Sequence, residues 1–118
     1  MSKKSVLALA GALVLFASSA FAQAAWPNKP IRLVAPYPPG GQTDVVSRYF
    51  AEKLSGVLGQ QVIVDNKPGA NGMVGMEIVK NAPGDGYTFV YVNSSMMCIN
   101  PYVYKKIPYD GFKDFMPV

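Results

Sequence analysis

Apolar residues recur along the chain in two alternating kinds of segment. Three short, mostly apolar runs predict strands: residues 31–35, 61–65 and 87–92. Apolar side chains at helical spacing predict helices after each strand: residues 44–58, 73–81 and about 97–104. Strands that alternate with helices favour right-handed crossovers and a parallel sheet with helices on its faces. The predicted fold class is therefore α/β.

The helix predicted at residues 44–58 has the clearest pattern and the clearest ends. Its apolar positions are Val46, Tyr49, Phe50, Leu54, Val57 and Leu58. Thr43 or Asp44 can cap its N-terminus, and Gly59 can end it.

The first 22 residues have the order of parts of a secretory signal peptide. Lys3 and Lys4 precede an apolar run at residues 5–17, and Ala20-Phe21-Ala22 is a cleavage signal. We therefore expect cleavage after about Ala22 and export of the mature chain from residue 23. A permanent N-terminal anchor is the alternative, although the run is shorter than the ~20 residues that span a bilayer.

Composition excludes several kinds of function. Beyond residue 22 there are nine Lys and Arg against seven Asp and Glu, a net charge of +2 without clusters, so nucleic-acid binding is not expected. The chain has no His, which excludes His metal ligands and His-dependent catalysis. Its single Cys, Cys98, forms no internal disulfide and is expected to be a buried apolar residue. Nucleotide-binding glycine motifs are absent, and we expect no cofactor and no metal.

Three loops leave the carboxyl ends of the predicted strands, where open parallel sheets bind ligands: residues 36–43, 66–72 and 93–100. In the first, Gly40 and Gly41 let a ligand approach the backbone. Gln42, Thr43 and Asp44 stand at the start of a helix, where free N–H groups favour an anion. The alternative is an ordinary Pro-Gly turn. Asp44 either caps the helix, orders the loop or accepts from a ligand ammonium.

The other two loops leave similar alternatives open. Pro68-Gly69 and Asn71-Gly72 are turn dipeptides, although the loop also offers N–H donors at the start of the next helix. The hydroxyls of Ser94 and Ser95 face the same crevice or cap a helix. Tyr37 stacks on a ligand or packs beside the prolines.

Five segments together resemble the Bug receptors, the TctC-like periplasmic receptors of tripartite tricarboxylate transporters. They are WPNKPIRLVAPYPPGGQTDVVSRYFAEKL, GQQVIVDNKPGANGMVG, APGDGYTFVYVNSS, INPYVYKKIPYD and DFMPV. The resemblance implies a three-layer parallel-sheet half-domain of a two-domain, flytrap-like periplasmic binding protein, incomplete in this chain. Residues 23–118 would be the N-terminal part of the first domain.

The resemblance also implies a monomeric, non-enzymatic receptor that captures a small carboxylate and delivers it to integral membrane permease subunits. By motif, the ligand carboxylate would be held, partly through water, by residues of all three loops: Tyr37, Pro39, Gly40, Gly41, Gln42, Thr43, Asp44, Ala70, Asn71, Gly72, Ser94 and Ser95. Gln42 stands where many relatives carry Ser, Ala or Gly, and Asn93 where many carry Gly. Side-chain contacts are thus less transferable than backbone contacts.

Two other hypotheses stay open from the sequence. An α/β enzyme that binds a phosphorylated small molecule would use the same helix N-terminus, because phosphate suits it as well as carboxylate does. A non-functional truncated receptor is the other, because the sequence ends on an apolar residue after Pro117 where another strand is expected to begin.

Overall fold

The computed structural model describes residues 25–118, so the predicted signal peptide lies outside the described residues. Its centre is a parallel sheet of three strands: β1 (Ile31–Ala35), β2 (Val62–Asn66) and β3 (Thr88–Val90). The strand order is β2-β1-β3, with Ile31 opposite Val62 and Arg32 opposite Thr88. The predicted α/β fold with a parallel sheet is confirmed.

The predicted bounds of two strands were wrong. β2 runs from Val62 to Asn66 instead of from residue 61 to residue 65, because Val62 pairs with Ile31 and Asn66 pairs with Ala35, the two ends of β1. β3 is three residues long instead of six, because only Arg32, Leu33 and Val34 of β1 have register partners in it. Single hydrogen bonds from Arg32 N–H to Tyr87 C=O and from Tyr91 N–H to Val34 C=O extend this pairing at each end.

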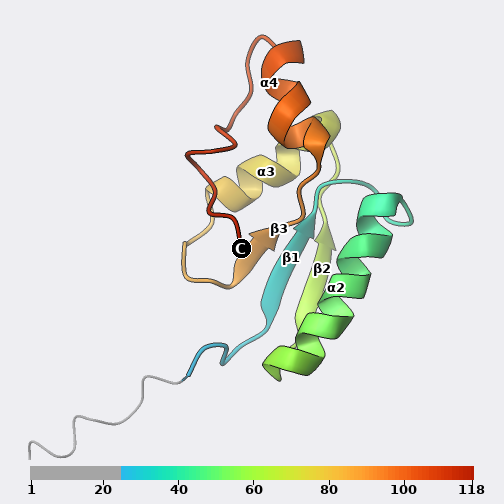
Figure 1. Ribbon diagram of the computed structural model, residues 1–118, viewed down its shortest axis with the longest axis vertical. Coiled ribbons are helices and arrows are strands. Elements are labelled where there is room, and N and C mark those ends of the chain that lie inside the picture. Colours follow the sequence, from blue (N-terminus) through green and yellow to red (C-terminus); the bar gives the residue numbers. More distant parts are fainter. Residues whose placement is uncertain (1–24) are drawn as a thin grey trace, which may run out of the picture.

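Two helices cover opposite faces of the sheet and make three layers (Figure 1). Helix α2 (Gln42–Leu58) joins β1 to β2 and packs on these two strands. A 3-10 turn, η2 (Ala70–Gly72), leads into α3 (Met73–Lys80), which joins β2 to β3 and packs on β3 and β1. The chain therefore leaves β1 toward one side of the sheet and later crosses to its other side.

Helix α2 begins two residues earlier than predicted, and its N-cap is Gly41 rather than Thr43 or Asp44. Gly59 ends it in the left-handed conformation, as predicted. Its buried face consists of small or polar residues: Thr43, Asp44, Ser47 and Ala51. The larger apolar side chains that predicted the helix are mostly exposed: Tyr49, Phe50, Leu54 and Val57. Small residues let the helix lie close to the sheet, so periodicity found the helix but not its buried side.

The apolar core divides between the two sheet faces. Under α2, Ile31, Ala51 and Val62 are buried. Under α3, the core is built from methionines and one tyrosine: Met73, Met76, Met96 and Tyr109. Met96 is fully buried in this cluster, and Met97 packs partly buried against it.

The predicted third helix is two short pieces instead of one. A π-helical turn, η3 (Ser95–Ile99), precedes α4 (Asn100–Val103), and together they begin two residues earlier than expected. Cys98 is exposed on this turn, so its predicted burial was wrong. Met96 occupies the inward position of η3, which leaves Cys98 toward solvent.

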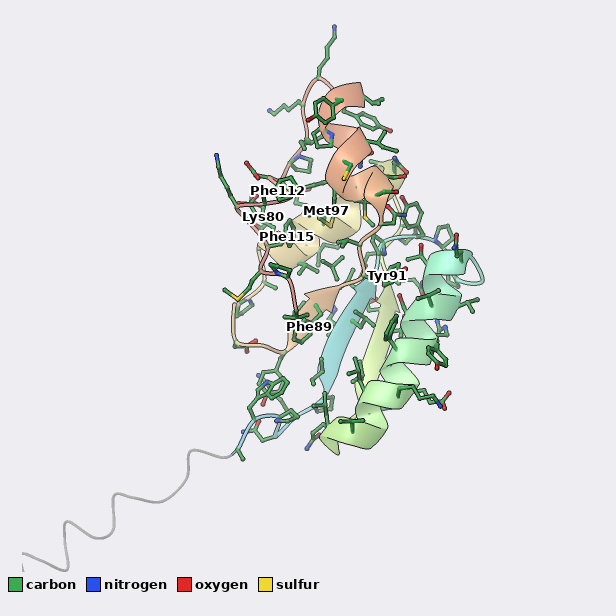
Figure 2. The ribbon with its side chains drawn as sticks, in the orientation of Figure 1. Lys80, Phe89, Tyr91, Met97, Phe112 and Phe115 are labelled. Carbon is green, nitrogen blue, oxygen red and sulfur yellow. The ribbon has the colours of Figure 1, made fainter. Side chains whose placement is uncertain are left out.

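The segment after α4 returns along α3 (Figure 1). Lys80 of α3 pairs with Asp114 at 2.9 Å and donates to the Pro108 carbonyl at 3.0 Å. Phe115 packs edge-on against Tyr109, and Figure 2 shows Lys80, Phe112 and Phe115 in the same region. Within residues 25–118, no helix has the length and apolar character needed to cross a membrane.

Candidate functional site

A hollow of about 720 Å³ lies beyond the carboxyl ends of the strands, where the three predicted loops meet. The order β2-β1-β3 makes this end of β1 and β3 a topological switch point, the usual ligand position in such sheets. The lining residues come from all three loops: Tyr37, Pro38, Pro39, Gly40, Gly41, Gln42, Thr43, Asn71, Asn93 and Ser95. None of these side chains carries a charge at neutral pH.

The loop after β1 presents backbone donors to this hollow. The first intrahelical hydrogen bond of α2 runs from Val45 N–H to Gly41 C=O, at 3.0 Å. The N–H groups of Gln42, Thr43 and Asp44 therefore have no acceptor within the helix. Together with the positive end of the helix dipole, they favour a negatively charged group.

The side chain of Asp44, in the first turn of α2, fixes the conformation of this loop. Its buried carboxylate accepts from Gly40 N–H at 2.9 Å, from Arg48 Nε at 3.0 Å and from Asn66 Nδ2 at 2.9 Å. The Arg48 guanidinium, followed by the Gly40 and Asn66 donors, lowers the pKa of Asp44 from 3.8 to about 2. Of the alternatives for Asp44, loop ordering is confirmed and the N-cap is wrong. Its oxygens are already occupied by these donors, so it is poorly placed to act on a ligand.

Asn66 links the same loop to β2. Its Nδ2 also donates to the Tyr37 carbonyl at 3.1 Å, and its Oδ1 accepts from Arg48 at 3.2 Å. Gly40, with φ +84°, makes the tight turn between the prolines and the helix. The loop after β1 is therefore fixed by side chains on both neighbouring elements.

Asn71 brings the loop after β2 to the hollow. It adopts a left-handed conformation with φ 51°, and its Oδ1 accepts from the Tyr37 hydroxyl at 3.0 Å. In the third loop, Asn93 lies just before η3, and its Oδ1 accepts from Met96 N–H at 3.2 Å. Ser95 lies at the start of that turn and lines the hollow.

The predicted residues do not all reach the hollow. Eight of them line it: Tyr37, Pro39, Gly40, Gly41, Gln42, Thr43, Asn71 and Ser95. Four do not: Asp44, Ala70, Gly72 and Ser94. Gly72 is instead a packing position, because a Cβ there would lie 2.6 Å from Met96 Sδ.

Sequence reasoning missed the side chains that support the site. Arg48 and Asn66 hold Asp44, and Asn100 and Tyr109 stand behind Asn71. The i to i+4 spacing of Asp44 and Arg48 on one helix was the one available signal. Among residues 25–118, no group of three His, Cys, Asp or Glu side chains is placed to hold a metal ion.

These features define part of a periplasmic binding protein. Solved structures of such proteins overlay on the chain, among them BugD, at 36% identity and a TM-score of 0.74 over 78% of this chain and 30% of that one. MatC from Rhodopseudomonas palustris with bound malate is 30% identical, with a TM-score of 0.76 over 79% of this chain and 32% of that one. R. palustris Rpa4515 with adipate is 36% identical, with a TM-score of 0.71 over 73% of this chain and 29% of that one.

The chain belongs to the tripartite tricarboxylate transporter family of receptors, TctC, whose pattern it matches over residues 46–118. A UPF0065 protein of Pseudomonas sp. strain P51 is 42% identical over 113 residues, which are 93% of this chain and 33% of that protein. The chain thus spans about a third of the length of the curated relatives it matches.

Proposed function

We propose that this chain forms one lip of the ligand cleft of a periplasmic solute receptor and binds the carboxylate of a small organic acid. The observation that carries the proposal is the pair of N–H groups at Gln42 and Thr43, which have no intrahelical acceptor and belong to residues that line an uncharged hollow. An anion held by such donors needs no Lys or Arg side chain, and the hollow offers none.

Dicarboxylic acids are the ligand class that we favour. Malate is bound in MatC and adipate in Rpa4515, and both proteins share this fold over most of the chain. The two acids differ in length and in hydroxylation but have a terminal carboxylate in common. A lip built from backbone donors suits that common group, whereas discrimination between acids would need contacts farther along the ligand.

The proposed mechanism is capture between two lips, followed by delivery to integral membrane permease subunits. A ligand shifts such a receptor toward its closed state only by binding that state more tightly. This chain supplies one lip, so we expect weak binding by the chain alone, with Kd in the millimolar range or above, which corresponds to about 4 kcal/mol or less.

One substitution tests the backbone donors directly. Gln42 is the first residue of α2, the position at which a helix tolerates proline, and Gly41 before it is extended, with ψ 172°. Gln42→Pro therefore deletes one N–H donor and leaves the helix intact. Gln42→Ala is the matched control, because it removes the side chain but keeps the N–H.

The measurement is a titration of both variants with malate and adipate, followed by amide NMR shifts. We expect Gln42→Pro to weaken carboxylate binding about tenfold, the effect of one charge-assisted hydrogen bond of about 1.4 kcal/mol, and Gln42→Ala to change it less than twofold. Equal losses in both variants would mean that the side chain binds the ligand. No loss in either would place the anion elsewhere and contradict the proposal.

A further inference from the structure

Asn100 is a fully buried polar residue that does not itself line the hollow. It is the first residue of α4, and its side chain faces the loop after β2, 29 positions earlier in the chain. Its Oδ1 accepts from Asn71 Nδ2 at 2.8 Å, and its Nδ2 donates to the Asn71 carbonyl at 3.1 Å. The two asparagines are therefore joined by a pair of hydrogen bonds.

The orientation of the Asn100 amide follows from its surroundings. The Asn71 carbonyl can only accept, so Nδ2 must face it. Tyr109 donates its hydroxyl proton to the Met96 carbonyl at 2.6 Å and can thus accept from Asn100 Nδ2, at 3.3 Å. Both donors of the amide and its oxygen are used, as a buried polar group requires.

The connection continues to the hollow. Asn71 uses its Nδ2 toward Asn100 and its Oδ1 toward the Tyr37 hydroxyl. One hydrogen-bonded path therefore runs from Met96 through Tyr109, Asn100 and Asn71 to Tyr37. It joins the loops that follow all three strands, and the last two residues line the hollow.

The conformation of the loop after β2 explains why such support is needed. Ala70 and Asn71 both have positive φ, 46° and 51°, in succession. A residue with a Cβ adopts this conformation at a cost of roughly 1–2 kcal/mol, and alanine lacks the side-chain hydrogen bonds that help asparagine. Such a conformation persists only where the surroundings hold it.

We propose that Asn100 is a positioning residue of the ligand lip, which holds Asn71 in its left-handed conformation and, through it, the Tyr37 ring at the hollow. The inference rests on the proposed function for its effect on binding. Its effect on Asn71 does not depend on any ligand.

The test compares two variants in the full 118-residue chain. Asn100→Leu keeps the branching and the number of side-chain heavy atoms and deletes all three hydrogen bonds. Ile31→Val removes one methyl group from the core on the opposite sheet face and serves as the control for general loss of stability. The first readout is the intraresidue amide-to-Hα nuclear Overhauser effect of Asn71, which a positive φ strengthens. The second is the affinity for malate by NMR titration.

We expect Asn100→Leu to weaken the Asn71 signal and to lower malate affinity about tenfold, while Ile31→Val changes neither. Asn100→Asp retains the acceptor for Asn71 Nδ2 but loses the two hydrogen bonds that Nδ2 donates, so it should give an intermediate result. If only the size of the side chain mattered, Asn100→Asp would behave like the unsubstituted chain. An unchanged Asn71 signal in Asn100→Leu would overturn the inference. If the unsubstituted chain showed no malate titration, the proposed function would fail for this chain, and the Asn71 signal would still decide the role of Asn100. If Asn100→Leu does not fold, Asn100→Asp alone decides, and an unchanged Asn71 signal there would overturn the inference.

Discussion

Alanine in place of Gly75 should destabilise the protein, although the same substitution stabilises most helices. Gly75 lies inside α3, where alanine is favoured over glycine by about 1 kcal/mol. A Cβ at this position would lie 2.6 Å from Pro36 Cβ, 3.0 Å from Pro36 Cα and 3.3 Å from the Lys67 carbonyl oxygen. Two of these neighbours are backbone atoms, so α3 itself must move away from the loop that carries the site.

The expected magnitude follows from these distances. Restoring ordinary contacts needs a displacement of about 1 Å in a tightly packed region, and overpacking of this kind costs roughly 1–3 kcal/mol. After the gain in helix propensity of about 1 kcal/mol is subtracted, we expect a net loss of up to about 2 kcal/mol. For a domain of this size, the upper end of that range lowers Tm by roughly 8–16 °C.

Gly56 provides the matched control. It lies inside α2, and a Cβ there would meet nothing within 4 Å. Gly56→Ala should therefore raise stability by about 0.5–1 kcal/mol. Thermal unfolding followed by circular dichroism compares the two variants. If Gly75→Ala raised Tm as Gly56→Ala does, the close contact between α3 and the base of the loop after β1 would be refuted.

Three further predictions concern single residues. The pKa of Asp44 is lowered from 3.8 to about 2, so its contribution to stability is complete above pH 4 and is lost as the pH falls through 2. When the free energy of unfolding is measured as a function of pH, Asp44→Asn should lack this loss. Ser47 Oγ is buried without a partner among the described residues, so Ser47→Ala should raise the free energy of unfolding by about 1 kcal/mol in urea titrations. By the same titration, Gly72→Ala should lower the free energy of unfolding by roughly 1–3 kcal/mol more than Gly40→Ala does. Both glycines have φ near +85°, but only a Cβ added at Gly72 would contact Met96, so equal losses would contradict this packing.

The fold could be predicted from the sequence because its strands and helices differ in hydrophobic periodicity and are separated by glycines and prolines. Three apolar strands and the glycines and prolines between them were sufficient for β1 and for the order of elements. The buried face of α2 could not be predicted in this way, because the side chains toward the sheet are chosen for small size rather than hydrophobicity. Pairing partners, which set the ends of β2 and β3, depend on the register and not on local composition.

The candidate site was predictable where it depends on backbone and not where it depends on distant side chains. Gly40 and Gly41 indicate a loop that a ligand can approach. The first residues of a helix supply backbone N–H donors whatever their side chains are. Asn100 and Tyr109 gave no signal, because their partners lie 9 to 29 positions away and only the folded chain brings them together. The inaccessibility of the Asp44 carboxylate could not be predicted either, because it results from hydrogen bonds that Arg48 and Asn66 donate to it in the folded chain.

The central claim is that the N–H groups at the start of α2 receive a ligand carboxylate. The most direct measurement is a crystal structure of the chain grown in a saturating concentration of malate. We predict one malate carboxylate within hydrogen-bond distance of the Gln42 and Thr43 N–H groups, beside Tyr37 and Asn71. Malate bound only to Lys or Arg side chains elsewhere, with the N–H groups of the loop facing solvent, would contradict the account.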